Sequence, residues 1–130
     1  MDQKVLFRAV AERTCLSREE SADVTRAVVE GLADQLSDGG ARRLAADLPG
    51  LGEQAQARRR RRTQARPVRL GDFIRQVSAR TGLTNEDARA GTGAVLAVLR
   101  EAEGEEEYRR LTGQLPGEYT GLGEAAPPEG

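Results

Sequence analysis

A chain of 130 residues and about 14 kDa forms one modest domain or two very small ones, which excludes a large multidomain enzyme. Hydrophobic residues make up 38% and charged residues 32%, as in a folded chain, but only two Phe and two Tyr are present, so Leu, Val and Ala are expected to build the core. The 20 basic and 21 acidic side chains nearly cancel, and no histidine is present. Net charge therefore indicates no partner, and chemistries that rely on histidine lose their main side chain.

The cellular location is predicted from two features of the sequence. The start of the chain lacks the apolar run of a secretory signal, and the longest apolar stretch, residues 94–99, is far short of the roughly 20 residues that cross a bilayer. The single cysteine, Cys15, cannot close a disulfide within the chain. We therefore expect a cytoplasmic protein with no transmembrane segment.

The chain contains an internal repeat. Shifted by 67 positions, residues 5–50 align without a gap with residues 72–117, and 16 of the 46 aligned pairs are identical. The identical pairs include Arg13 with Arg80 and the Leu-Pro-Gly that closes each segment. A duplicated unit is the simplest explanation, so the two copies are predicted to share one helical plan.

Each copy is predicted to contain three helices. Apolar residues such as Leu6 and Val10 fall three or four positions apart, which places them on one face of a short helix. Ser17 and Glu20 have the spacing of a capping box that opens a long helix, and Thr84 begins a looser version in the second copy. Glycines at 39–40 and 104 are expected to end the long helices. A third, shorter helix then runs to each Leu-Pro-Gly.

The sequence therefore predicts an all-α protein, because no stretch shows the two-residue alternation of a strand. We expect two tandem three-helix units, residues 1–50 and 71–119, packed as one pseudo-two-fold helical bundle, since a unit of about 46 residues has a marginal core on its own. Small residues of the second long helix, including Gly91 and Gly93, are expected at the seam. Residues 51–70 are predicted to form an arginine-rich connector, and residues 120–130 a disordered tail.

Several segments carry a resemblance to a known family. The first copy contains FRAVAERT at 7–14, LSREE at 16–20, AVVEGL at 27–32 and LAADLP at 44–49, and the second contains DFIRQV at 72–77 and LTGQLP at 111–116. Together they resemble the bacterial domain-of-unknown-function family 2267, over nearly the whole chain. The resemblance implies an all-helical bacterial protein and supplies no catalytic or binding residues. The five consecutive arginines of the connector depart from the family pattern.

The connector is the segment whose charge indicates a partner. Residues 53–70 carry seven arginines and one glutamate, whereas the segments on both sides are net acidic. Guanidinium groups bind phosphate oxygens through paired hydrogen bonds, and their binding to nucleic acid releases counterions. The candidate anion or nucleic-acid site therefore consists of seven residues: Arg58, Arg59, Arg60, Arg61, Arg62, Arg66 and Arg69.

Other interpretations of the connector stay open. Arginine supplies 19 of the 20 basic residues, so its abundance here can reflect coding bias, and no aromatic residue interleaves with the run to stack on bases. The run can also be a solvated, self-repelling linker, or can bind an acidic protein surface or an anionic membrane. The sequence leaves open whether it is a helix, a flexible linker or a binding site.

Three smaller features carry hypotheses. Cys15 lies in an expected turn with no histidine to activate it, so a turn residue is favoured over a nucleophile. Arginine pairs at 42–43 and 109–110 recur in both copies and could line a symmetric anion site, although the exposed face of a short helix explains them equally well. The glutamates at 105–107 are interpreted as a helix start rather than a metal site, because adjacent residues point to different sides.

The sequence as a whole predicts a non-enzymatic interaction module with no catalytic residue, metal or cofactor. Nucleic-acid binding through the arginines at 58–62 is the alternative function. The specific partner is open, and a homodimer is possible because a bundle with few large side chains would enlarge its core by dimerising.

Overall fold

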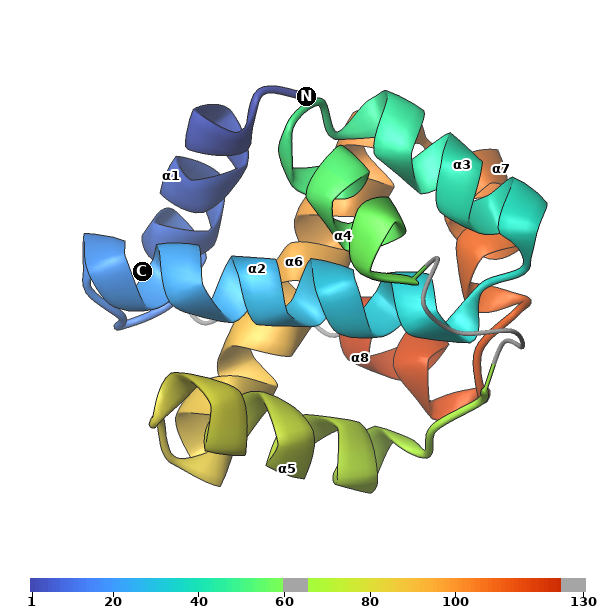
Figure 1. Cartoon of the computed structure of the whole chain (residues 1–130). Coiled ribbons are helices and arrows are strands. Elements are labelled where there is room, and N and C mark those ends of the chain that lie inside the picture. Colours follow the sequence, from blue (N-terminus) through green and yellow to red (C-terminus); the bar gives the residue numbers. More distant parts are fainter. Residues whose placement is uncertain (60–65, 125–130) are drawn as a thin grey trace.

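The computed structural model of the chain describes residues 1–59 and 66–124. Within these two ranges the chain forms helices and turns and no strand, so the predicted all-α class is confirmed (Figure 1). The helices of the described ranges are α1 (Gln3–Arg13), α2 (Arg18–Gln35), α3 (Asp38–Asp47), α4 (Leu51–Arg59), α5 (Leu70–Thr81), α6 (Asn85–Glu103), α7 (Glu105–Thr112) and α8 (Glu118–Glu124).

The first residues of these helices repeat the 67-residue shift seen in the sequence. α5, α6, α7 and α8 begin 67 positions after α1, α2, α3 and α4, respectively. In the described ranges each copy therefore has four helices, and the expected three are one too few. The fourth helix follows the Leu-Pro-Gly of each copy. α4 lies in the connector, whose conformation the sequence left open, and α8 begins two residues before the predicted tail.

The prediction of a disordered tail from residue 120 is wrong for residues 120–124. These residues complete α8, because Tyr119 is fully buried and Gly123 packs closely on Tyr108. Residues 125–130, the rest of the predicted tail, lie outside the described residues.

The turns between helices use the caps that the sequence indicated, with one exception. Ser17 Oγ accepts from the amide of Glu20 at 3.1 Å while the Glu20 carboxylate accepts from the amide of Ser17 at 2.9 Å, which is the predicted capping box. Glycines 39 and 40 do not end α2, since they lie in the first turn of α3. Ser37 caps that helix by accepting from the amide of Gly40.

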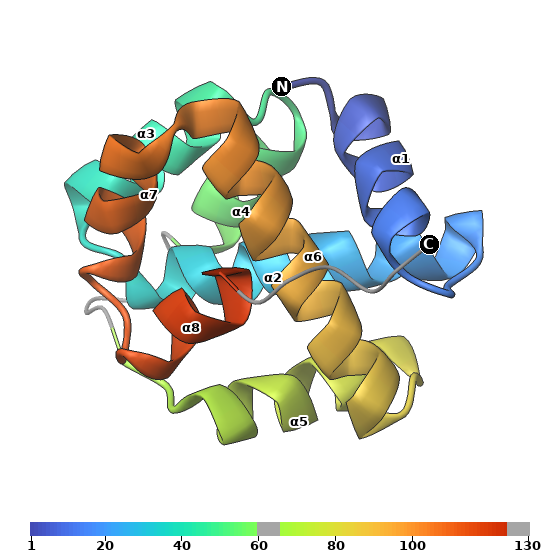
Figure 2. The same cartoon turned by 180° about the vertical axis from the view of Figure 1, so that it is seen from behind.

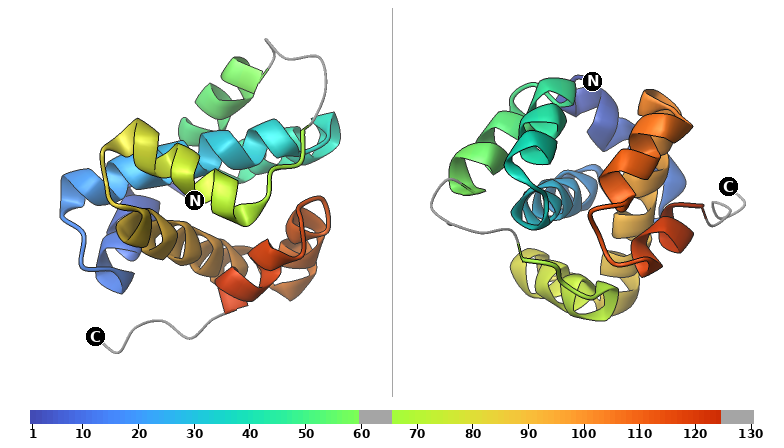
Figure 3. Two further views of the ribbon diagram at one scale, coloured as in Figure 1. Left: turned by 90° about the horizontal axis from the view of Figure 1, so that it is seen from below. Right: turned by 90° about the vertical axis from the view of Figure 1, so that its right-hand side faces the viewer.

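α2 is the central helix of the fold. It contacts α1, α3, α4, α5 and α6, and the right panel of Figure 3 shows it nearly end-on among its neighbours. From behind, α6 crosses α2 (Figure 2). At this crossing a Cβ on Gly91 would lie 2.6 Å from a methyl carbon of Val24, so the predicted place of Gly91 at the seam is confirmed. Gly93 instead faces Leu122 of α8.

The contacts between the two copies are reciprocal. α1 packs on α6, and its counterpart α5 packs on α2. Gly31 allows the second contact, because a Cβ there would come within 2.5 Å of the Phe73 ring. Each short helix thus covers the long helix of the other copy, which supplies the apolar area that a single copy lacks.

Aromatic side chains contribute more to the core than the composition suggested. Phe73, Tyr108 and Tyr119 are fully buried among leucines, valines and alanines. Tyr119 packs edge-on against Phe73 with ring centroids 5.5 Å apart. No helix in the described ranges is both long and apolar enough to cross a membrane.

A closed hydrogen-bond network anchors the chain where it leaves the connector. The buried Gln35 side chain donates to the Tyr119 hydroxyl at 3.0 Å, that hydroxyl donates to the Val68 carbonyl at 2.5 Å, and the Val68 amide donates back to the Gln35 amide oxygen at 2.8 Å. Burial raises the pKa of Tyr119 to about 12. The network ties α2 and α8 to the segment that precedes α5.

Candidate functional site

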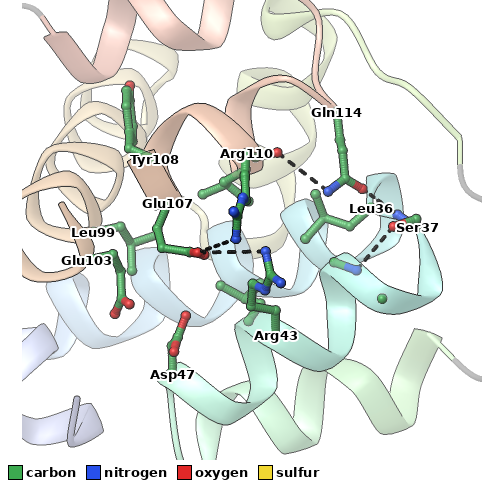
Figure 4. A pocket seen from close by; sticks show the side chains of 14 residues that line it. Leu36, Ser37, Arg43, Asp47, Leu99, Glu103, Glu107, Tyr108, Arg110 and Gln114 are labelled. Atoms are coloured by element: carbon green, nitrogen blue, oxygen red, sulfur yellow. Dashed lines mark hydrogen bonds and ion pairs between the residues drawn. The ribbon is translucent and has the colours of Figure 1, made fainter. Parts of the chain in front are cut away.

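A cleft between α3 and α7 is the strongest candidate site in the described part of the chain. It has a cavity volume of about 320 Å³ and lies between the equivalent third helices of the two copies (Figure 4). We name it the α3–α7 cleft. Its apolar lining comes from Leu36, Leu44, Leu99, Tyr108 and Leu111.

Two arginines from equivalent repeat positions point at one carboxylate inside this cleft. Arg43 of α3 and Arg110 of α7, hereafter the arginine pair, lie 67 positions apart in the sequence. An Nη atom of Arg110 lies 2.9 Å from Glu107 Oε1, and an Nη atom of Arg43 lies 3.7 Å from the same oxygen (Figure 4). The first is a charge-assisted hydrogen bond and the second a looser ion pair.

One end of the cleft is acidic. Asp47 and Glu103 line it on the side away from Gln114 (Figure 4). Burial, together with the nearby Asp47, raises the pKa of Glu103. The cleft therefore has an acidic end, the arginine pair beside it, and a largely apolar lining.

The third polar region of the cleft joins α7 to the start of α3. The Gln114 side chain accepts from the amide of Ser37 at 2.8 Å and donates to the Arg110 carbonyl at 3.5 Å. Gly40 lines this end, and a Cβ there would come within 2.7 Å of the Gln114 amide. These bonds fix the separation of the two helices and hence the width of the cleft.

A second, shallower hollow lies beside α5. It is lined by both described arginines that follow the run, Arg66 and Arg69, and by Arg75 of α5, with Pro67 and Val68 between them. Arg69 lies 3.8 Å from the Glu118 carboxylate, and Arg75 is paired with Asp72. These ion pairs are exposed, so solvent screens them and they contribute little to stability.

Four of the seven predicted site arginines lie in the described ranges. Arg58 and Arg59 belong to the last turn of α4, while Arg60, Arg61 and Arg62 lie outside the described residues. Arg66 and Arg69 lie in the extended segment before α5, and both are exposed. None of these placements tests binding by the arginine run, which stays a prediction.

Of the adjacent arginines at 42–43 and 109–110, one of each two lines the cleft and the other does not. Arg43 and Arg110 line the α3–α7 cleft, whereas Arg42 and Arg109 are exposed and are not among the residues that line it. Sequence reasoning raised a symmetric anion site at these pairs but missed Glu107 as the common partner of Arg43 and Arg110. The useful signal was that Arg110 has glutamates three and four positions before it, while Arg43 has Gly40 and Gly39 there.

The glutamates at 105–107 begin α7, as predicted, and each pairs with an arginine. Glu105 pairs with Arg100, and Glu106 and Glu107 with Arg110. Cys15 is exposed in the turn between α1 and α2.

Comparison with known proteins places this fold in one family. No curated protein matches the chain. A family of uncharacterized conserved proteins, DUF2267, matches residues 4–122, a range that runs from the first turn of α1 into α8. This match covers both copies of the repeat and most of each of the eight described helices, so the chain belongs to the DUF2267 family.

Proposed function

We propose that this protein is a non-enzymatic binding module and that it binds through the α3–α7 cleft. The observation that carries the proposal is the convergence of Arg43 and Arg110, from equivalent positions of the two copies, on one carboxylate over an apolar lining. Concave apolar sites with a few oriented polar groups are typical ligand sites, and their volumes start at about 300 Å³. The cleft has this composition and reaches that volume.

The proposal is tested by closing the cleft without changing its charge. Gly39 lines the cleft, and a Cβ on it would meet nothing within 4 Å, so Gly39→Trp places an indole ring at the cleft without disturbing the core. Gly71 is the matched control, because it is also the second residue of a helix, is exposed, and has open space around its Cβ position.

The probe is anilinonaphthalene sulfonate, whose fluorescence increases in an apolar site. The wild-type chain and Gly71→Trp are expected to bind it at one site, and Gly39→Trp to bind it at least about tenfold more weakly. Circular dichroism and cooperative melting show that each variant is folded, which separates cleft binding from dye uptake by a loosened core. Equal dye binding by all three chains would overturn the proposal.

The second candidate function is nucleic-acid binding through the arginine run. One structural observation supports it: the hollow beside α5 brings Arg66, Arg69 and Arg75 together directly after the run. Five arginines that each neutralise one phosphate give a slope of about −4 to −5 for log affinity against log salt. Duplex DNA titrated at increasing salt measures this slope, with arginines 58–62 changed to serine as the control chain. No binding at about 50 mM salt would remove this candidate.

A further inference from the structure

The α3–α7 cleft is suited to a small ligand with an apolar part. This inference rests on the proposed function and specifies its ligand. Four leucines and a tyrosine line the cleft, and the charged groups lie at its acidic end and around the arginine pair. A volume of about 320 Å³ is at the lower limit for small-molecule sites, so the apolar part of the ligand is short.

Glu107 does not satisfy the hydrogen-bonding capacity of the arginine pair. Both guanidinium contacts fall on the same oxygen, Oε1, and the contact from Arg43 is 3.7 Å long, beyond hydrogen-bond distance. Arginine binds a carboxylate best through two parallel hydrogen bonds. A free carboxylate between the two arginines could offer one oxygen to each guanidinium, which the tethered Glu107 does not.

Glu107 also has an alternative to the arginine pair. It is the third residue of α7, where the positive end of the helix dipole favours a carboxylate. Gly104, the N-cap residue, provides no side chain to accept from the amides of this turn. Since the Glu107 side chain is 31% exposed, it can leave the arginines and remain solvated beside those amides.

The acidic end of the cleft restricts the charge of the ligand. Asp47 and Glu103 line the same cleft, so a ligand there lies near two carboxylates. Burial is the main cause of the raised pKa of Glu103, Asp47 adds to it, and the N-terminal ammonium opposes it. A carboxylate brings one negative charge, which replaces that of the displaced Glu107. A phosphate monoester brings about 1.5 to 2 at neutral pH and would be repelled more strongly.

We propose that the α3–α7 cleft binds a monocarboxylate with a short apolar body, and that the ligand carboxylate displaces Glu107 from the arginine pair. The apolar body lies against Leu44 and Leu99. Glu107 then competes with the ligand carboxylate for the arginine pair.

The test compares three ligands that contain eight carbons each: octanoate, octyl phosphate and octanol. Their affinities for the full-length chain are measured at pH 8 by displacement of anilinonaphthalene sulfonate and checked by calorimetry. Octanoate is expected to bind about tenfold or more tightly than octanol, because the alcohol has no charge for the arginines. Octyl phosphate is expected to bind more weakly than octanoate. Equal affinities for octanoate and octanol, or tighter binding of octyl phosphate, would overturn the inference.

Two pairs of variants assign the effect to named residues. The double variant Arg43→Gln with Arg110→Gln is expected to bind octanoate no better than octanol, whereas Arg42→Gln with Arg109→Gln retains the wild-type preference. Glu107→Gln removes the competing charge, so its octanoate affinity is expected to rise by a factor of about three to ten, with no change for octanol. All four arginines are exposed, so the folded state tolerates these changes. Weaker octanoate binding by Glu107→Gln would contradict the displacement of Glu107.

The outcomes separate this inference from the proposed function. If Gly39→Trp abolishes dye binding but octanoate and octanol bind equally, the cleft is a binding site and the ligand class is wrong. If Gly39→Trp leaves dye binding unchanged, the cleft itself is not the site, and both proposals fail.

Discussion

The two copies of the repeat share the hydrogen bonds that end their first helix and begin their second, and they differ most in their fourth helices, where no aligned pair is identical. In the first half of each copy the threonine at the end of the short helix, Thr14 or Thr81, donates to the carbonyl four residues before it, and the long helix begins at a capped serine or threonine. In the second half, Gly40 of α3 corresponds to Glu107 of α7. The cleft between the third helices therefore combines a shared arginine, Arg43 or Arg110, with a glutamate that only the second copy has.

The fourth helices show the same divergence most clearly, because Gly52 of α4 corresponds to Tyr119 of α8. In the first copy the absence of a side chain lets α4 approach α3, and a Cβ on Gly52 would lie 2.6 Å from the Cα of Ala45. In the second copy Tyr119 is buried and holds the segment before α5. One position thus serves close backbone packing in one copy and a hydrogen-bonded anchor in the other.

The largest predicted effect is the removal of that anchor. Tyr119→Ala is expected to lower the free energy of unfolding by about 3–5 kcal/mol, because it leaves a cavity beside Phe73. It also leaves Gln35 without its partner in the network. Urea denaturation measures the change. Tyr119→Phe keeps the ring and is expected to cost about 1–2 kcal/mol; a loss below about 1 kcal/mol for Tyr119→Ala would show that α8 does not anchor the fold.

The ionisation of Tyr119 provides a second test of the anchor. Its pKa is raised to about 12 in the folded chain, above the roughly 10 of an unfolded tyrosine. The folded state therefore holds its proton more tightly, and this stabilisation is complete below pH 10 and is lost as the pH rises toward 12. Between pH 9 and 12 the wild-type chain is expected to lose about 2 kcal/mol more than Tyr119→Phe.

The matched measurement for that prediction is the ultraviolet absorbance of tyrosinate. Tyr108 is also shifted upward by burial, and it is present in both chains, so the difference between them isolates Tyr119. A Tyr119 that ionises near pH 10 would mean that α8 opens readily.

Gly52→Ala tests the opposite role of the same repeat position. The added methyl group meets the backbone of Ala45 and not a flexible side chain, so α4 must move away from α3. A destabilisation of about 1–3 kcal/mol is expected. The control is Gly39→Ala, which has open space and is expected to be neutral or stabilising by up to about 1 kcal/mol. Equal stability of the two variants would show that the α3–α4 contact is loose.

The part of the fold that the sequence predicted correctly rests on local chemistry. Helix starts at Ser17 and Thr84 are determined by hydrogen bonds within three residues, and these are visible as sequence spacing. α8 was missed and the helix at α4 was left open because few of their residues are apolar, and both segments bury single side chains such as Leu51 and Tyr119. Such burial depends on tertiary contacts that no local pattern reports.

The candidate site was predicted only in part, for a related reason. The repeat alignment indicated that Arg43 and Arg110 are equivalent, but equivalence does not state that both face one cleft. That requires the approach of α3 to α7. Gln114 fixes this approach by hydrogen bonds to Ser37, which lies 77 positions earlier in the sequence, and to Arg110, which lies 4 positions earlier. The arginines at 58–62 are the clearer signal of a binding site in the sequence because their charge is local. The cleft arises only where segments that are distant in the sequence meet.

The smallest predicted effect uses the copies as references for each other. Ser21 is fully buried, and its Oγ has no hydrogen-bond partner among the described residues, while the equivalent position in the second copy is the buried Ala88. Ser21→Ala removes a desolvated hydroxyl and is expected to stabilise the chain by about 1 kcal/mol. Ala88→Ser introduces the same group into the other copy and is expected to destabilise by about 1–3 kcal/mol. Thermal melting of both variants decides the matter: if Ser21→Ala destabilises, the hydroxyl has a role that the second copy lacks, and the first two helices are less alike than their caps indicate.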